Sequence, residues 1–138
     1  MYDGGVRVPF MLRWPAMVKP GVSDAFVCQM DLLASFAGLL GQTYPDKLDS
    51  RNTLKAFLGK SKKGREKLVI EGMFNYAYRK GDWALIPPYR KQTEYQLYNL
   101  KEDIGQKHNL ADKYPKKVKE LTDEFEALKL STGKKTRF

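Results

Sequence analysis

The sequence has little of what disulfide scaffolds, metal sites and membrane spans require. Its 138 residues include one cysteine, Cys28, and one histidine, His108. A single cysteine cannot close an intramolecular disulfide, and a lone histidine lacks the partners of a metal site. Apolar runs are too short to cross a bilayer, and the first residues lack a signal-peptide pattern. We therefore expect a globular chain with no membrane partner, in which Cys28 is a small buried hydrophobe.

Acidic residues are fewer than basic ones. Lysine and arginine number 25 against 16 aspartates and glutamates, which gives a net charge of +9. The basic excess is concentrated in residues 59–67 and 133–138, both rich in turn formers. Such runs are most often solvated loops and tails, and the alternative is a surface for a polyanion. Because 42% of the residues are hydrophobic and 12% aromatic, the chain can build a packed core.

The first sixty residues predict a strand followed by helices. Residues 6–14 are β-prone but interrupted by Pro9, which predicts an edge strand or an irregular one. Residues 23–41 place apolar side chains on one face at helical spacing, with Gly41 where the helix would stop. We expect this helix to be well buried through Met30, Leu33, Ala34, Ala37 and Leu40.

The pattern of the residues after about 60 predicts an antiparallel sheet followed by a helix that packs on it. Residues 67–72, 75–88 and 93–103 are β-prone, and the Gly81-Asp82 pair lies where a hairpin turn would. Pro115 is placed for the first turn of a final helix. That helix carries an apolar stripe, which needs a surface to cover. Its members are Val118, Leu121, Phe125 and Leu128.

Four motifs, in this order, resemble the C-terminal portion of the sulfatases, the arylsulfatase-like enzymes of the alkaline phosphatase superfamily. They read YDGGVRVPFMLRWPAMVKPG, MDLLASFAGLLG, AYRKGDWALI and YQLYNLKEDIGQKHNLADKYP. The match covers nearly the whole chain. Two departures are visible, since Ala34-Ser35 stands where Pro-Thr is usual and Ala84 replaces a common lysine.

The resemblance implies sulfate ester hydrolysis by residues that this chain lacks. Sulfatases use a formylglycine made from a Cys/Ser-x-Pro/Ala-x-Arg motif, beside a divalent cation that is usually calcium. Cys28 is followed by Gln29 and Met30, so it is not that nucleophile. The family's catalytic lysine lies a few residues before the Gly-Gly motif, and this sequence begins after that position. We therefore expect no catalytic residue, metal ligand or cofactor here, with calcium and formylglycine belonging to the intact enzyme.

The resemblance also implies an architecture. Residues 1–60 would be the C-terminal end of the α/β catalytic domain, and residues 61–138 the C-terminal subdomain. The expected fold is α+β, a small antiparallel sheet packed by a C-terminal helix and preceded by a strand and a helix. Arg79 and Lys80, between aromatic residues, are the candidate contacts to an anionic substrate, a sulfated sugar or an aryl sulfate. Alone, the chain should be inactive.

Several residues have a structural interpretation instead. We expect Gly4 and Gly5 to form a tight turn and not a phosphate loop, because no helix N-terminus or Lys-Ser/Thr pair follows them. Arg7 would brace this turn. His108 lies in a polar segment and is expected at the surface.

The expected partners follow from both interpretations. Residues 6–14 would be buried against the missing N-terminal catalytic part, so in the isolated chain they should pair with another copy, repack or be disordered. Sulfatases are commonly periplasmic, lysosomal or secreted, and the resemblance implies one of these compartments for this chain. The alternative function is a non-catalytic module that binds sulfated glycan or nucleic acid.

Overall fold

The computed structural model describes residues 2–45, 48–73 and 75–131. The described residues form two compact units, one within residues 9–66 and one in which residues 2–8 join those between 67 and 131. This division falls near the expected boundary at residue 60, while the assignment of each part to a sulfatase domain stays a prediction. The basic segment 133–138 lies outside the described residues.

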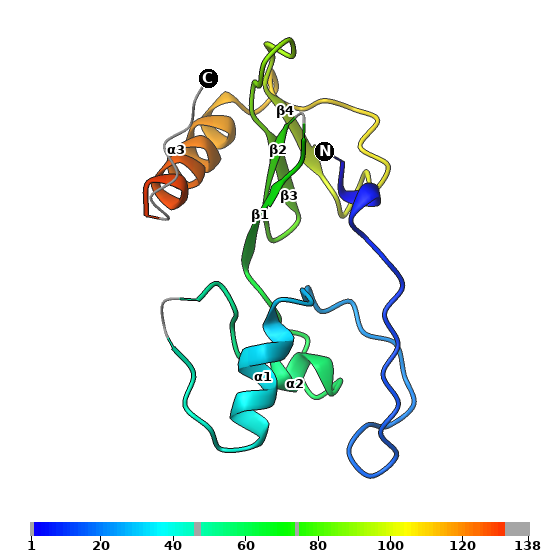
Figure 1. Ribbon diagram of the computed structural model, residues 1–138. Coiled ribbons are helices and arrows are strands. Elements are labelled where there is room, and N and C mark those ends of the chain that lie inside the picture. The colour runs from blue at the N-terminus through cyan, green and yellow to red at the C-terminus, as the bar shows by residue number, and fades with distance from the viewer. Residues whose placement is uncertain (1, 46–47, 74, 132–138) are drawn as a thin grey trace. The chain divides into compact units, whose positions relative to one another are not determined.

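The second unit is built on a four-stranded antiparallel sheet (Figure 1). Its strands follow one another in space as in sequence, from β1 to β4. They are β1 (Lys67–Glu71), β2 (Tyr76–Lys80), β3 (Trp83–Ile86) and β4 (Gln96–Asn99). Lys80 pairs with Trp83, so the intervening Gly81-Asp82 is a two-residue turn, with Gly81 at a φ of +56° that glycine adopts without cost. The predicted sheet and its hairpin are confirmed.

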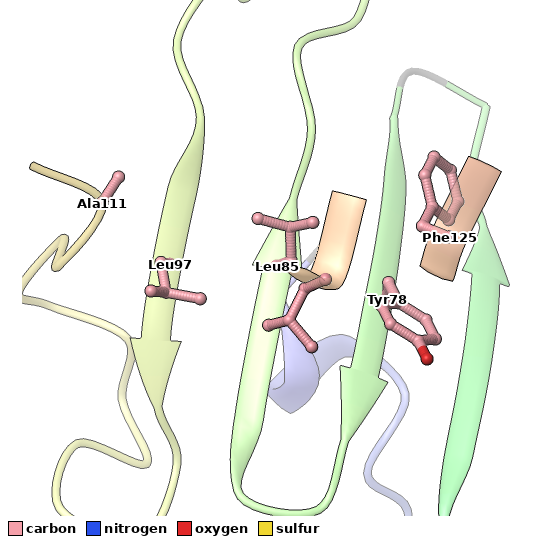
Figure 2. Close-up of a cluster of buried hydrophobic side chains, with 6 residues drawn as sticks. Tyr78, Leu85, Leu97, Ala111 and Phe125 are labelled. Carbon is pink, nitrogen blue, oxygen red and sulfur yellow. The ribbon is translucent and has the colours of Figure 1, made fainter. Parts of the chain in front are cut away.

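One face of the sheet packs against α3 (Pro115–Ser131). Tyr78, Leu85 and Leu97 project from three neighbouring strands into a cluster that Phe125 of α3 completes (Figure 2). Leu121 belongs to the same cluster and is fully buried. The predicted apolar stripe of the last helix therefore supplies the core, and the α+β fold class is confirmed.

The other face of the sheet is covered by the N-terminal segment. The short 3-10 helix η1 (Asp3–Gly5) turns the chain there, with the N–H of Gly5 donating to the carbonyl of Tyr2 at 3.0 Å. The ring of Tyr2 meets that of Tyr98 edge to face at 6.1 Å. Gly4 and Gly5 thus form a tight turn, as predicted.

Two helices organise residues 9–66. They are α1 (Asp31–Leu39) and α2 (Leu54–Phe57). Gly41 and Gly59 follow them with φ of +65° and +66°, the left-handed conformation that ends helices. The predicted stop at Gly41 is confirmed.

The strand expected over residues 6–14 is not formed. Residues 7–14 belong to no described helix or strand, and Pro9 has no N–H to offer a sheet ladder. The segment instead contacts α2, where the rings of Phe10 and Phe57 lie 5.5 Å apart. Its β-prone composition was a poor guide because a strand needs a partner strand, and the described part of the chain supplies none here.

The prediction for the helix in residues 23–41 is also wrong, because the apolar face that was expected to be buried is largely exposed. Ala34 is buried, but Leu33 is 59% and Leu40 71% exposed. The buried side of α1 carries Asp31 and Ser35 instead, both fully inaccessible. These polar residues face inward because they bind backbone groups of the segment that follows, which leaves the apolar side of α1 in solvent.

Candidate functional site

Arg79 and Lys80, the predicted substrate contacts, point to opposite faces of the sheet. Successive side chains of a strand alternate between faces, and both residues belong to β2. Arg79 lies on the face covered by the N-terminal segment, whereas Lys80 lies on the face covered by α3. The two cations therefore do not converge on one anion.

Asp3 is the centre of the network on the N-terminal face. Its Oδ1 lies 3.1 Å from Nη1 of Arg79, and its Oδ2 pairs with Arg7. The backbone N–H of Asp3 donates to Oε1 of Gln106 at 2.5 Å. Asp3 is only 7% exposed, so its buried carboxylate is compensated by two guanidinium groups. Arg7 braces the Gly-Gly turn as predicted.

A tyrosine pair extends this network. Tyr2 and Tyr98 both donate their hydroxyl groups to Oε1 of Gln96, at 3.3 and 3.2 Å. Burial, followed by the neighbouring Tyr2 hydroxyl, raises the pKa of Tyr98 to about 12. Tyr98 is therefore a neutral hydrogen-bond donor at physiological pH and not a base.

Lys80 is engaged on the α3 face. Its Nζ lies 2.5 Å from Oε1 of Glu124 and 3.5 Å from Oε1 of Glu120. Tyr78 donates its hydroxyl to Oε2 of Glu124 at 2.8 Å. The hydrogen bond to Glu124 raises the pKa of Lys80, and the hydrogen bonds from Lys80 and Tyr78 lower the pKa of Glu124. The arrangement ties α3 to β2.

The Lys80–Glu124 contact gives a testable pH dependence. The folded-state pKa of Glu124 is below its ordinary value of 4.5, so its contribution is present above about pH 4.5 and is lost as pH falls through the lowered pKa. We expect Glu124→Gln to lower the melting temperature by a few degrees at pH 7 and the difference from wild type to shrink as the pH falls below about 4.5. Thermal melts from pH 7 to pH 3 test this, and a gap that stays constant over the range would contradict it.

The described residues hold no cluster that would bind a metal. Among them, no three histidine, cysteine, aspartate or glutamate side chains converge. Cys28 is free and half-buried, and His108 is an exposed side chain whose Nδ1 lies 3.5 Å from Asp103. Calcium, expected in the intact enzyme, therefore does not fit the acids present in this part of the chain. No helix in the described ranges has the length and apolarity to cross a membrane.

A depression of about 560 Å³ lies beside α1. Two of its polar side chains are used within the fold, since Ser50 accepts the N–H of Ala34 and Asn52 accepts that of Leu54. Its lining comprises Ala34, Gly38, Gln42, Tyr44, Leu48, Ser50, Arg51 and Asn52. This set has no nucleophile paired with a base, so it carries no catalytic arrangement.

Comparison with known proteins gives the family. Residues 1–131 match the family model described as N-sulphoglucosamine sulphohydrolase, C-terminal. This chain belongs to that family of C-terminal sulfatase domains. An N-acetylgalactosamine-6-O-sulfatase of Bacteroides thetaiotaomicron is 38% identical over 93% of this chain and 28% of its own length. Human arylsulfatase A is 37% identical over 50% of this chain and 14% of its own length.

Solved structures agree with this sulfatase-domain assignment. A protein from a study of glycosaminoglycan metabolism by Bacteroides thetaiotaomicron superposes with a TM-score of 0.75 at 35% identity, covering 86% of this chain and 28% of that one. A second, solved with its substrate D-glucosamine-2-N,6-O-disulfate, has a TM-score of 0.69 at 23% identity, covering 88% and 28%, and supports the fold alone. The sulfatase domain thus spans a little over a quarter of these relatives.

The sequence did not identify Asp3, Gln106 and Glu124 as partners in these networks. Asp3 had a visible signal, because it stands in the acidic position before Gly-Gly in the sulfatase motif. Gln106 and Glu124 had no such signal, because each is more than forty residues away in the sequence from its partner, Asp3 or Lys80.

Proposed function

We propose that this chain is the C-terminal part of a sulfatase, a sulfuric ester hydrolase, and that it helps shape the pocket for a sulfated sugar or aryl sulfate. Such hydrolysis needs a nucleophile and groups that stabilise the leaving oxygen, and the described residues present neither. The chain alone is then inactive. The N-terminal catalytic part supplies the calcium site and the formylglycine.

Arg79 and Lys80 remain the candidate substrate contacts in this proposal. Each is already paired, Arg79 with Asp3 and Lys80 with Glu124. A substrate anion would have to share or displace a carboxylate, which weakens the attraction that a lone cation would offer. We expect either residue to act in the intact enzyme only after such an exchange.

One observation carries the proposal, the apolar surface of residues 9–66. Met11 is 92%, Leu33 59% and Phe36 50% exposed. Phe10, Leu12, Trp14, Met30, Leu40 and Leu48 are exposed large hydrophobics of the same unit. Leu33 and Phe36 lie three residues apart on α1 and so share one face of that helix, and an apolar helix face in solvent is typical of a surface that another protein segment covers.

The relatives indicate what covers this surface. The chain spans 28% of the length of the Bacteroides N-acetylgalactosamine-6-O-sulfatase, so that protein has a large additional part for the surface to pack against. In an isolated chain the same surface would favour self-association, which light scattering measures. The compartment expected for such a sulfatase is the periplasm, the lysosome or the exterior of the cell.

A chimera tests the proposed function. The C-terminal region of the Bacteroides N-acetylgalactosamine-6-O-sulfatase is replaced by this chain, and hydrolysis of the sulfated sugar is measured. We expect turnover by the chimera and none by the chain alone or by the truncated relative alone. A folded chimera without turnover, or turnover by the isolated chain, would overturn the proposal.

A second candidate function, polyanion binding, is favoured by one basic loop. Lys60, Lys62 and Lys63 are exposed and, among the described residues, make no ion pair with a carboxylate. A true polyanion-binding module would bind heparin or single-stranded DNA with an affinity that falls steeply with salt. We expect weak retention that a Lys60, Lys62 and Lys63 triple alanine variant abolishes without affecting the chimera's turnover.

A further inference from the structure

The connection between β3 and β4 carries a two-residue hairpin of its own. Tyr89 and Gln92 form a bridge in which the N–H of each donates to the carbonyl of the other, at 2.8 and 3.1 Å. Arg90 and Lys91 are the two residues at its tip, and this connection extends beyond the ends of the strands (Figure 1). The bridge holds these two adjacent cations in a tight turn.

Arg90 adopts a backbone conformation that glycine favours. Its φ is +53°, and a two-residue hairpin whose first central residue has positive φ usually has glycine there. An arginine in this position is strained, and strain of this kind is concentrated at functional sites. The turn chemistry alone gives no reason for a cation at this point.

The tip is supported by aromatic rings that reach the core. The guanidinium carbon of Arg90 lies 5.3 Å from the ring centre of Tyr89. The Tyr89 ring meets that of Tyr76 edge to face at 5.4 Å, and Tyr76 lies 5.7 Å from the buried Phe125. The contact between Arg90 and the Tyr89 ring limits the freedom of the Arg90 side chain before any ligand binds, which lowers the entropic cost of binding.

The charges at the tip are available to a ligand. Arg90 and Lys91 are exposed, and no carboxylate among the described residues pairs with either. Arg79 and Lys80, in contrast, are both engaged in ion pairs. An incoming anion at the tip therefore displaces no protein carboxylate.

We propose that Arg90 and Lys91 bind one sulfate group of a sulfated saccharide. The planar guanidinium donates two hydrogen bonds to an oxyanion, and the neighbouring ammonium adds a further donor and charge. Two consecutive cations at the tip of one hairpin suit a single anionic group, whereas nucleic acid is bound along an extended basic track. The saccharide as ligand class rests on the proposed sulfatase function, and the binding site rests on the hairpin geometry.

The experiment is a titration of the full chain, followed by amide and arginine side-chain NMR signals. The probe is N-acetylgalactosamine 6-sulfate, with unsulfated N-acetylgalactosamine as its control. We expect saturable shifts at Arg90, Lys91 and Gln92 with the sulfated sugar only. Arg90→Ala and Lys91→Ala should each weaken binding about tenfold, the usual effect of losing a charge-assisted hydrogen bond.

Two further variants separate charge from structure. Arg90→Gly suits the positive φ and keeps the hairpin, so it should leave the Tyr89–Gln92 bridge intact and still lose binding. Lys113→Ala is the matched control, because Lys113 is also an exposed cation over the ring of its neighbour, with its Nζ 5.5 Å from the Tyr114 ring centre. That variant should bind like wild type.

Three results would overturn this proposal: wild-type affinity in Arg90→Gly, shifts spread over many lysines, or equal competition by single-stranded DNA. Its failure is distinguishable from failure of the proposed function. An inactive chimera with intact sulfated-sugar binding at the tip contradicts only the sulfatase proposal. An active chimera with no shifts at Arg90 and Lys91 contradicts only the binding site.

Discussion

Replacing Arg65 by alanine should destabilise residues 9–66 by about 3–5 kcal/mol, the cost of leaving one charge of a buried pair without its partner. Arg65 donates from Nε to Oδ2 of Asp31 at 3.0 Å and from Nη2 to Oδ1 at 2.7 Å. Asp31 is fully buried and also accepts the N–H of Arg51 at 2.9 Å. The hydrogen bond that Arg65 donates to Asp31 is the main cause of the raised pKa of Arg65, so this guanidinium stays charged in the folded chain.

Urea denaturation followed by fluorescence of Trp14, which lies in this unit, measures the Arg65 effect. Arg65→Lys keeps the charge but not the bidentate geometry and should lose an intermediate amount. The double variant Asp31→Asn, Arg65→Met should recover part of the loss, because no buried charge is then left unpaired. An unchanged denaturation midpoint in Arg65→Ala would show that the pair does not hold this unit together.

The second large effect is expected for Phe125→Ala, which should destabilise the sheet unit by about 3–5 kcal/mol. Phe125 is 1% exposed, and its ring centre lies 5.7 and 6.2 Å from those of Tyr76 and Tyr78. Removing the ring leaves a cavity between α3 and β2 and also removes the surface on which the Lys129 ammonium lies, at 4.6 Å from the ring centre.

Fluorescence of Trp83, on β3, reports unfolding of this unit in denaturant. Leu130→Ala on the same helix is the matched control, because Leu130 is 74% exposed and its truncation should change stability by less than about 0.5 kcal/mol. If both variants unfolded at the wild-type midpoint, α3 would not be packed on the sheet as described.

Local pattern was enough to predict the sheet and the last helix. The hairpin at Gly81 needs positive φ, Pro115 suits a first helical turn, and the stripe through Leu121 and Phe125 needs a surface. Each of these signals lies within a few residues of the element that it specifies. For the same reason Arg79 and Lys80 could have been assigned to opposite faces from strand alternation alone.

The features that the sequence did not predict depend on contacts between residues far apart in the chain. Asp31 and Ser35 take the inward side of α1 because Arg65 and the N–H of Thr53 bind them, and periodicity of apolar residues cannot anticipate such partners. The N-terminal turn lies on the sheet because Asp3 meets Arg79 and Gln106. The two Asp3 contacts join residues that are 76 and 103 positions apart in the sequence, which local propensity cannot predict.

The most direct test of the account uses one double variant in two settings. Leu33→Gln, Phe36→Gln alters exposed residues of α1, so it should change the stability of the isolated chain by less than about 0.5 kcal/mol. In the chimera, where this face would pack against the catalytic part, it should abolish most sulfatase turnover, whereas Leu130→Gln should not. Full activity of the chimera carrying the double variant would show that the apolar face of α1 is not the contact with the rest of a sulfatase.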